Sequence, residues 1–143
     1  MGRQPRGDTP KWDTVLAHRP SDVRDAVCHR FVESGITPES VNAVLDDGGD
    51  SLYAAARSGE QDWMDGFGGP LAVALLAAEV SALAAHLNSR SSAVRAVAVD
   101  TLLEDFSAVT VAARLGISRQ KVYEIGSGTL TASFIDRVPW RQP

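Results

Sequence analysis

Apolar residues recur at helical spacing between Pro70 and Asn88, and this pattern constrains the fold more than any other feature of the sequence. They are separated by three, four, three and four positions: Val73, Leu76, Val80, Leu83 and Leu87. At about 3.6 residues per turn, all of them lie on one side of an α-helix. No segment alternates apolar and polar residues in the way that a half-buried strand does. The chain is therefore predicted to be all-α, a helical bundle.

The same apolar residues form a seam of a and d positions over two heptads, and such a seam can pair two copies of the protein. Two heptads are short for a coiled coil, so packing inside the protein's own core explains the seam equally well. The sequence thus predicts a homodimer along this helix, with a core helix as the alternative.

Glycine, proline and capping residues divide the rest of the chain into further helices. The expected helices are 21–35, 38–46, 51–58, 70–88 and 92–105. The spacing in the last of them predicts that five apolar side chains face the core: Val94, Val97, Ala98, Leu102 and Phe106. Beyond it, the clearest local signals lie between residues 107 and 127.

Composition excludes several classes of protein. The 143 residues have the length of one domain, and 44% of them are hydrophobic, as in a globular protein. A single cysteine, Cys28, permits no disulfide within the chain and no cysteine zinc site, and the three histidines lack ligand spacing. The longest uncharged stretch, 66–78, is shorter than a membrane span of about 18 residues. We therefore expect no metal, no cofactor, no enzymatic activity, no membrane span and a cytoplasmic location.

Charge is distributed unevenly along the chain, although the net charge is only −4. Residues 1–20 carry four basic and two acidic residues and are rich in Gly and Pro, which predicts a flexible basic arm. Region 21–88 has three basic and eleven acidic residues, and region 89–143 has seven basic and five acidic. We interpret the acidic region as a part for interaction or dimerisation. A polyanion is expected to meet the ends of the chain and to avoid its middle.

Residues 107–127 read SAVTVAARLGISRQKVYEIGS and predict two short helices joined by a tight turn. Ser107 and Ser118 are expected to cap the helices, and Gly116 is expected to end the first in a left-handed conformation. The apolar and small residues predicted to fill the space between the helices or to form the turn are Ala112, Leu115, Gly116, Ile117, Val122 and Ile125. Such a pair is the helix-turn-helix unit.

The second helix of this pair divides into an apolar and a polar side. At about 100° per residue, Val122 and Ile125 share one side, and the polar residues span an arc of roughly 140° on the other. That arrangement suits a recognition helix in the major groove, where Arg pairs with guanine and Gln with adenine. The residues expected to contact DNA are Ser118, Arg119, Gln120, Lys121, Tyr123 and Glu124.

The stretch VAARLGISRQKVY resembles the helix-turn-helix of bacterial transcription regulators over about one seventh of the chain. The resemblance implies sequence-specific binding of double-stranded DNA, with two copies on two half-sites. The stretch also resembles excisionase-like winged-helix proteins, since SGTL follows at 127–130. The following TASFIDRVPW has few basic residues and no hairpin signal, which argues against a wing. The alternative from another class is an interaction module whose acidic region binds a basic partner.

Overall fold

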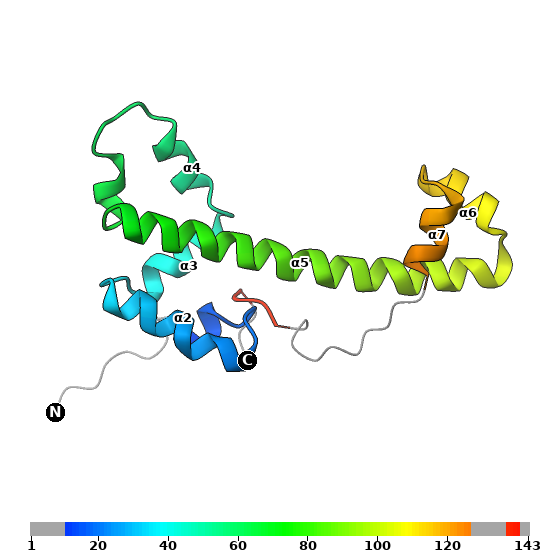
Figure 1. The fold of residues 1–143 in the computed structure, drawn as a ribbon, viewed down its shortest axis with the longest axis horizontal. Helices are drawn as coiled ribbons and strands as arrows, with labels where there is room; N and C mark the ends of the chain where they lie inside the picture. The colour runs from blue at the N-terminus through cyan, green and yellow to red at the C-terminus, as the bar shows by residue number, and fades with distance from the viewer. Residues whose placement is uncertain (1–10, 127–136, 141–143) are drawn as a thin grey trace. The chain divides into compact units, whose positions relative to one another are not determined.

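The computed structural model describes residues 11–126 and 137–140 of the chain (Figure 1). These residues form seven α-helices, one short 3-10 helix and no strand. The predicted all-α fold class is therefore confirmed. The described residues divide into two units, one made of 11–86 with 137–140 and the other of 87–126. Each unit contains buried apolar side chains of its own.

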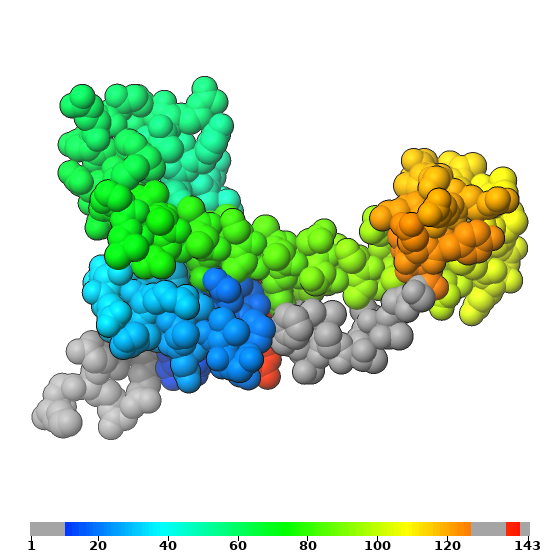
Figure 2. Space-filling view, in the orientation of Figure 1, coloured from blue at the N-terminus to red at the C-terminus, as the bar shows by residue number. Residues whose placement is uncertain are grey.

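The first unit is built from short helices around the beginning of a long one. They are α1 (Trp12–Val15), α2 (Ser21–Glu33), α3 (Pro38–Asp46), α4 (Asp50–Ala56), η1 (Trp63–Phe67, the 3-10 helix) and α5 (Pro70–Asp105). In Figure 1, α2 and α3 lie on one side of α5 and α4 lies on the other. In Figure 2, α4 and η1 form a lobe that stands on α5. Phe31, Val41 and Leu76 are at most 1% exposed and lie at the centre of the core.

α5 is one continuous helix of 36 residues, so the prediction of two helices, 70–88 and 92–105, is wrong. The intervening residues 89–91 are Ser-Arg-Ser and include neither Gly nor Pro. A serine costs a helix only about 0.5 kcal/mol relative to alanine, and such a cost does not interrupt a helix whose flanking turns are already formed. By length and composition alone, α5 is the one helix among the described residues that is long and apolar enough to cross a membrane.

The apolar seam of α5 is a core feature in its central part. Leu76 is 1% exposed and Leu83 is 4% exposed, while Val73 and Val80 are half-buried. Side chains buried in this way are already covered by the first unit itself. Leu76 and Leu83 therefore follow the core-helix alternative, and dimerisation of the protein stays a prediction that the described residues do not test.

Residues 11–20 do not form a flexible arm, which corrects the second half of the predicted segment 1–20. Val15 and Leu16 are fully buried, and His18 is 2% exposed. Trp12 stacks on Phe31 of α2, with ring centroids 5.6 Å apart and an interplanar angle of 11°. Burial of these apolar side chains orders a segment for which the Gly and Pro content predicted flexibility. Residues 1–10, with Arg3 and Arg6 of the predicted arm, lie outside the described residues.

A buried carboxylate joins α5 to the segment before α2. Glu79 is 1% exposed, and its Oε2 accepts hydrogen bonds from His18 Nε2 at 2.6 Å and from Arg19 Nε at 2.9 Å. Its Oε1 accepts from Arg19 Nη2 at 3.0 Å. Burial alone would raise the pKa of Glu79, but these hydrogen bonds and the charge of Arg19 outweigh it and lower the pKa. The ionised carboxylate is therefore stabilised inside the unit.

Candidate nucleic-acid interface

The second unit contains two short helices at the positions that the sequence predicts. α6 (Ala108–Leu115) begins after Ser107, whose hydroxyl accepts a hydrogen bond from the Thr110 amide at 3.2 Å. This bond satisfies one of the amides that the first turn of a helix leaves without a partner. α7 covers Arg119–Ile125. We refer to α6, the turn 116–118 and α7 together as the helix pair.

The turn of the helix pair depends on glycine. Gly116 has φ +68° and ψ +34°, a left-handed conformation that L residues with a Cβ rarely adopt. The Ile117 amide donates to the Ala112 carbonyl at 3.0 Å, which closes the end of α6. Ser118 then caps α7, its hydroxyl accepting from the Lys121 amide at 3.0 Å. The two helices are thus separated by three residues, each with a defined local role.

The helix pair packs on the last part of α5 and forms one apolar cluster with it. The buried members are Ala96, Val99, Ala108, Val111, Ala112, Val122 and Ile125. Leu102, Leu103 and Ile117 pack against them as partly buried residues. The cluster therefore fixes α7 by its apolar side, because Val122 is fully buried and Ile125 is 8% exposed.

One residue of the predicted motif core lies elsewhere. Leu115 is 43% exposed, so the prediction that it fills the space between the helices is wrong. Its spacing from Ala108, Val111 and Ala112 is correct for the buried side, but α6 ends at Leu115. Ile117 of the turn packs against that end of the cluster instead.

The side of α5 that enters the cluster also differs from the prediction. Val94, Val97 and Phe106 are 60%, 38% and 49% exposed, and the buried residues are Ala96 and Val99. The side of α5 that is buried is the side that the end of α7 approaches. A Cβ built on Gly126, just after α7, would lie 3.3 Å from Leu103 Cδ1 and 3.6 Å from Val99 Cγ1. The end of α7 approaches this side of α5 closely, and helical spacing alone does not distinguish the two sides.

The polar residues of α7 are all exposed, as is the capping residue Ser118. The exposed set is Arg119, Gln120, Lys121, Tyr123 and Glu124, with Tyr123 63% exposed. Lys121 Nζ lies 3.8 Å from Glu124 Oε2, a surface pair of the kind that contributes little to stability. These side chains are available to a ligand while the opposite side of the helix is buried.

The sequence interpretation missed Arg114 as a site residue. It lies in the last turn of α6 and is exposed. With Arg114, the described helix pair carries three basic residues and one acidic residue, in contrast to the acidic region 21–88. The signal in the sequence was a basic residue next to Leu115, five positions before the predicted contact residue Arg119.

The C-terminal part of the predicted region 89–143 is divided between the units. SGTL at 127–130 and residues up to 136, on which a wing would depend, lie outside the described residues. Val138 is 2% exposed and belongs to the first unit. The sequence predicts 89–143 as a helix-turn-helix DNA-binding region with a C-terminal tail, with one continuous domain as the alternative, and Val138 and Pro139 of that tail are buried in the first unit.

No protein-family model matches this chain, and no curated protein and no solved structure matches it. Within the described residues, no group of three or more His, Cys, Asp or Glu side chains is placed to hold a metal ion. What the helix pair does must therefore be inferred from its own geometry and charge.

Proposed function

We propose that this protein is a bacterial, cytoplasmic transcriptional regulator that binds double-stranded DNA sequence-specifically by placing α7 in the major groove. The observation that carries the proposal is the division of α7 into two sides. Val122 and Ile125 hold it on α5 and α6, while the polar side chains project outward. A recognition helix needs this arrangement, because its side chains must reach base edges without loosening the domain.

The residue types on the exposed side match the chemistry of base edges. Arg119 and Gln120 are the first two residues of α7, where recognition helices usually contact bases. A guanidinium pairs with the two acceptors of guanine, and a carboxamide pairs with the donor and acceptor of adenine. Tyr123 is suited to a phosphate or a thymine methyl, and Glu124 to the amino group of cytosine.

Binding affinity would come mainly from phosphate contacts. Lys121 and Arg114 flank the proposed base-reading residues and are exposed, so we assign them to the phosphates. The overall charge of −4 opposes the approach to DNA, and one helix pair supplies few cations. We therefore propose that two copies bind two half-sites about one helical turn apart.

A mobility-shift titration on duplexes selected from a random pool tests the proposal. We expect retardation that weakens steeply with salt, and a loss of about 1–3 kcal/mol of discrimination for Arg119→Ala and for Gln120→Ala. Lys121→Ala should weaken binding to all sequences alike. Arg30→Ala, which removes an exposed arginine of α2, is the matched control and should bind like the wild type. If the two α7 variants bind the selected duplex as the control does, α7 is not the recognition helix.

An interaction module remains the second candidate function. The observation that favours it is the excess of eleven acidic over three basic residues in region 21–88, which suits a basic partner. Absence of retardation on any duplex at any salt concentration would favour this candidate over DNA binding. The excisionase-like alternative depends on a wing at residues outside the described ranges.

A further inference from the structure

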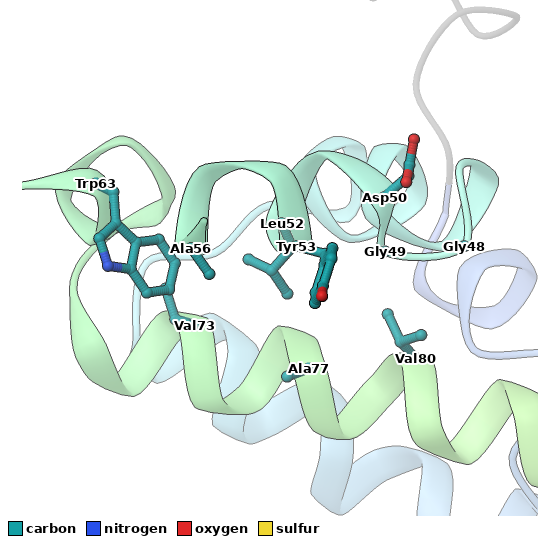
Figure 3. A pocket seen from close by; sticks show the side chains of 10 residues that line it. All are labelled: Gly48, Gly49, Asp50, Leu52, Tyr53, Ala56, Trp63, Val73, Ala77 and Val80. Atoms are coloured by element: carbon teal, nitrogen blue, oxygen red, sulfur yellow. The ribbon is translucent and has the colours of Figure 1, made fainter. Parts of the chain in front are cut away.

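An apolar groove separates α4 and η1 from the first part of α5 within the first unit. It has a volume of about 560 Å³. The residues that line it are Gly48, Gly49, Asp50, Leu52, Tyr53, Ala56, Trp63, Val73, Ala77 and Val80. In Figure 3, Leu52 and Tyr53 point from α4 towards α5, Val73 and Val80 point back, and the carboxylate of Asp50 points away. The walls are therefore aliphatic and aromatic.

The groove has a defined end where the backbone of α4 approaches α5. A Cβ built on Gly49 would lie 3.2 Å from Val80 Cγ2, and Gly49 has φ +81°. The left-handed backbone favours glycine at this position, and a Cβ would displace the Val80 methyl by a few tenths of an ångström. The residue before α4 thus lies close to α5 at this end of the groove.

The apolar surface of the groove is left open to solvent. Among the lining residues, Tyr53 is 63% exposed. Ala56 of α4 and Ala77 of α5 also line the groove and are exposed. In the most apolar 18 residues of α5, only 28% are buried. An apolar surface with the exposed Tyr53 ring beside it is one that another chain can cover.

The elements around the groove are strongly acidic. Between the end of α3 and the end of η1, the chain carries Arg57 and six exposed acidic residues: Asp46, Asp47, Asp50, Glu60, Asp62 and Asp65. Arg57 lies over the Tyr53 ring, 5.9 Å from its centroid. With six acidic residues and one basic residue, the lobe of α4 and η1 that walls the groove on one side has a net charge of −5, and we call it the acidic lobe. An apolar groove beside an acidic lobe complements a partner that is apolar on one side and basic on the other. These six carboxylates are spread along a segment of 20 residues, so they favour a partner with several positive charges over a single small cation.

We propose that this groove docks a basic amphipathic helix of a partner protein. Val73 and Val80 are seven residues apart on α5, a distance of about 10 Å at 1.5 Å per residue, so the groove accommodates two turns of a helix. The partner places apolar side chains at i, i+3 or i+4, and i+7 on the groove, and its Lys and Arg side chains face the acidic lobe. This inference does not depend on DNA binding by α7, since all the residues involved belong to the first unit.

The test measures binding of the full chain to a fluorescent synthetic peptide of about five helical turns, built from Leu and Lys with the Leu residues on one side. Fluorescence anisotropy reports the affinity. We expect saturable binding that weakens as salt is added, and roughly tenfold weaker binding of a scrambled Leu/Lys peptide and of a Leu/Glu peptide with the same spacing.

Matched variants locate the binding surface. Ala77→Lys places a cation in the groove and should weaken binding roughly tenfold, and Tyr53→Ala should weaken it too. Ala26→Lys makes the same charge change on an exposed residue of α2 and should leave binding nearly unchanged. Circular dichroism checks that all variants remain helical, and retained binding to a selected duplex keeps this test separate from that of α7.

Three results would overturn the proposal. The first is equal binding of the Leu/Lys and Leu/Glu peptides, which would mean that the charge of the acidic lobe is not involved. The second is an equal effect of Ala77→Lys and Ala26→Lys, which would move the site elsewhere. The third is full displacement of the peptide by tetraphenylphosphonium at peptide-like concentrations, which would identify the groove as a site for small apolar cations.

Discussion

Replacing Glu79 with Gln should destabilise the first unit by about 3 kcal/mol near neutral pH. The carboxylate is 1% exposed and accepts three hydrogen bonds, one from His18 and two from Arg19. Removing one partner of a buried ion pair typically costs about 3–5 kcal/mol. We expect the lower end of this range, because Gln keeps the shape of the side chain and the Arg19 side chain is 25% exposed and can be partly hydrated.

The loss should depend on pH with a defined sign. Since the pKa of Glu79 is lowered in the folded state from an ordinary value of 4.5, the folded protein gains stability from the ionised carboxylate above that value. The gain disappears as the pH falls through the folded-state pKa, below 4.5, where the carboxyl becomes protonated. The Gln variant has no such group. The difference between the two proteins should therefore be constant at higher pH and should shrink in acid.

Urea denaturation followed by circular dichroism measures both effects, and Glu33→Gln is the matched control. Glu33 lies in a surface pair with His29 at 3.2 Å, with side chains 66% and 71% exposed. Its loss should change the free energy of unfolding by less than about 0.5 kcal/mol. If Glu79→Gln costs no more than this control, or if its cost is the same in acid, the carboxylate does not stabilise the unit in the way described.

Further changes test the two cores and the thiol. Gly116→Val should lower the stability of the second unit by more than about 1 kcal/mol through backbone strain alone, since a Cβ there meets no atom within 4 Å; unchanged unfolding would contradict the left-handed turn. Ala112→Leu should cost about 1–3 kcal/mol by overpacking the cluster, and a wild-type melting temperature would mean that the helices do not cross at this residue. Leu76→Glu combined with Leu83→Glu should unfold or aggregate the first unit. A folded monomer on light scattering would mean that this seam lies on the surface and not in the core. Burial, with the charges of Asp25 and Asp13, raises the pKa of Cys28, so the thiol should react with iodoacetamide near neutral pH more slowly than free cysteine, and equal rates would refute this.

The local structure of the helix pair could be predicted from adjacent residues alone. Ser107 and Ser118 each bond an amide three residues later, and Gly116 adopts its left-handed conformation within a single residue. These interactions depend only on residues that are close in the sequence, so capping and turn patterns predict them without knowledge of the rest of the chain. The same holds for Val122 and Ile125, since α7 has only one apolar side to bury.

Where the local pattern allows more than one buried side, packing between distant elements selects which side is buried. Both Val94 with Val97 and Ala96 with Val99 fit a helical stripe, and the approach of α7 selected the second. Glu79 is the clearest case. In the sequence it is one charge in an apolar helix, and its partners lie 60 and 61 residues earlier. A buried charge is tolerated only when opposite charges and donors reach it, and packing of elements distant in sequence is what brings them there.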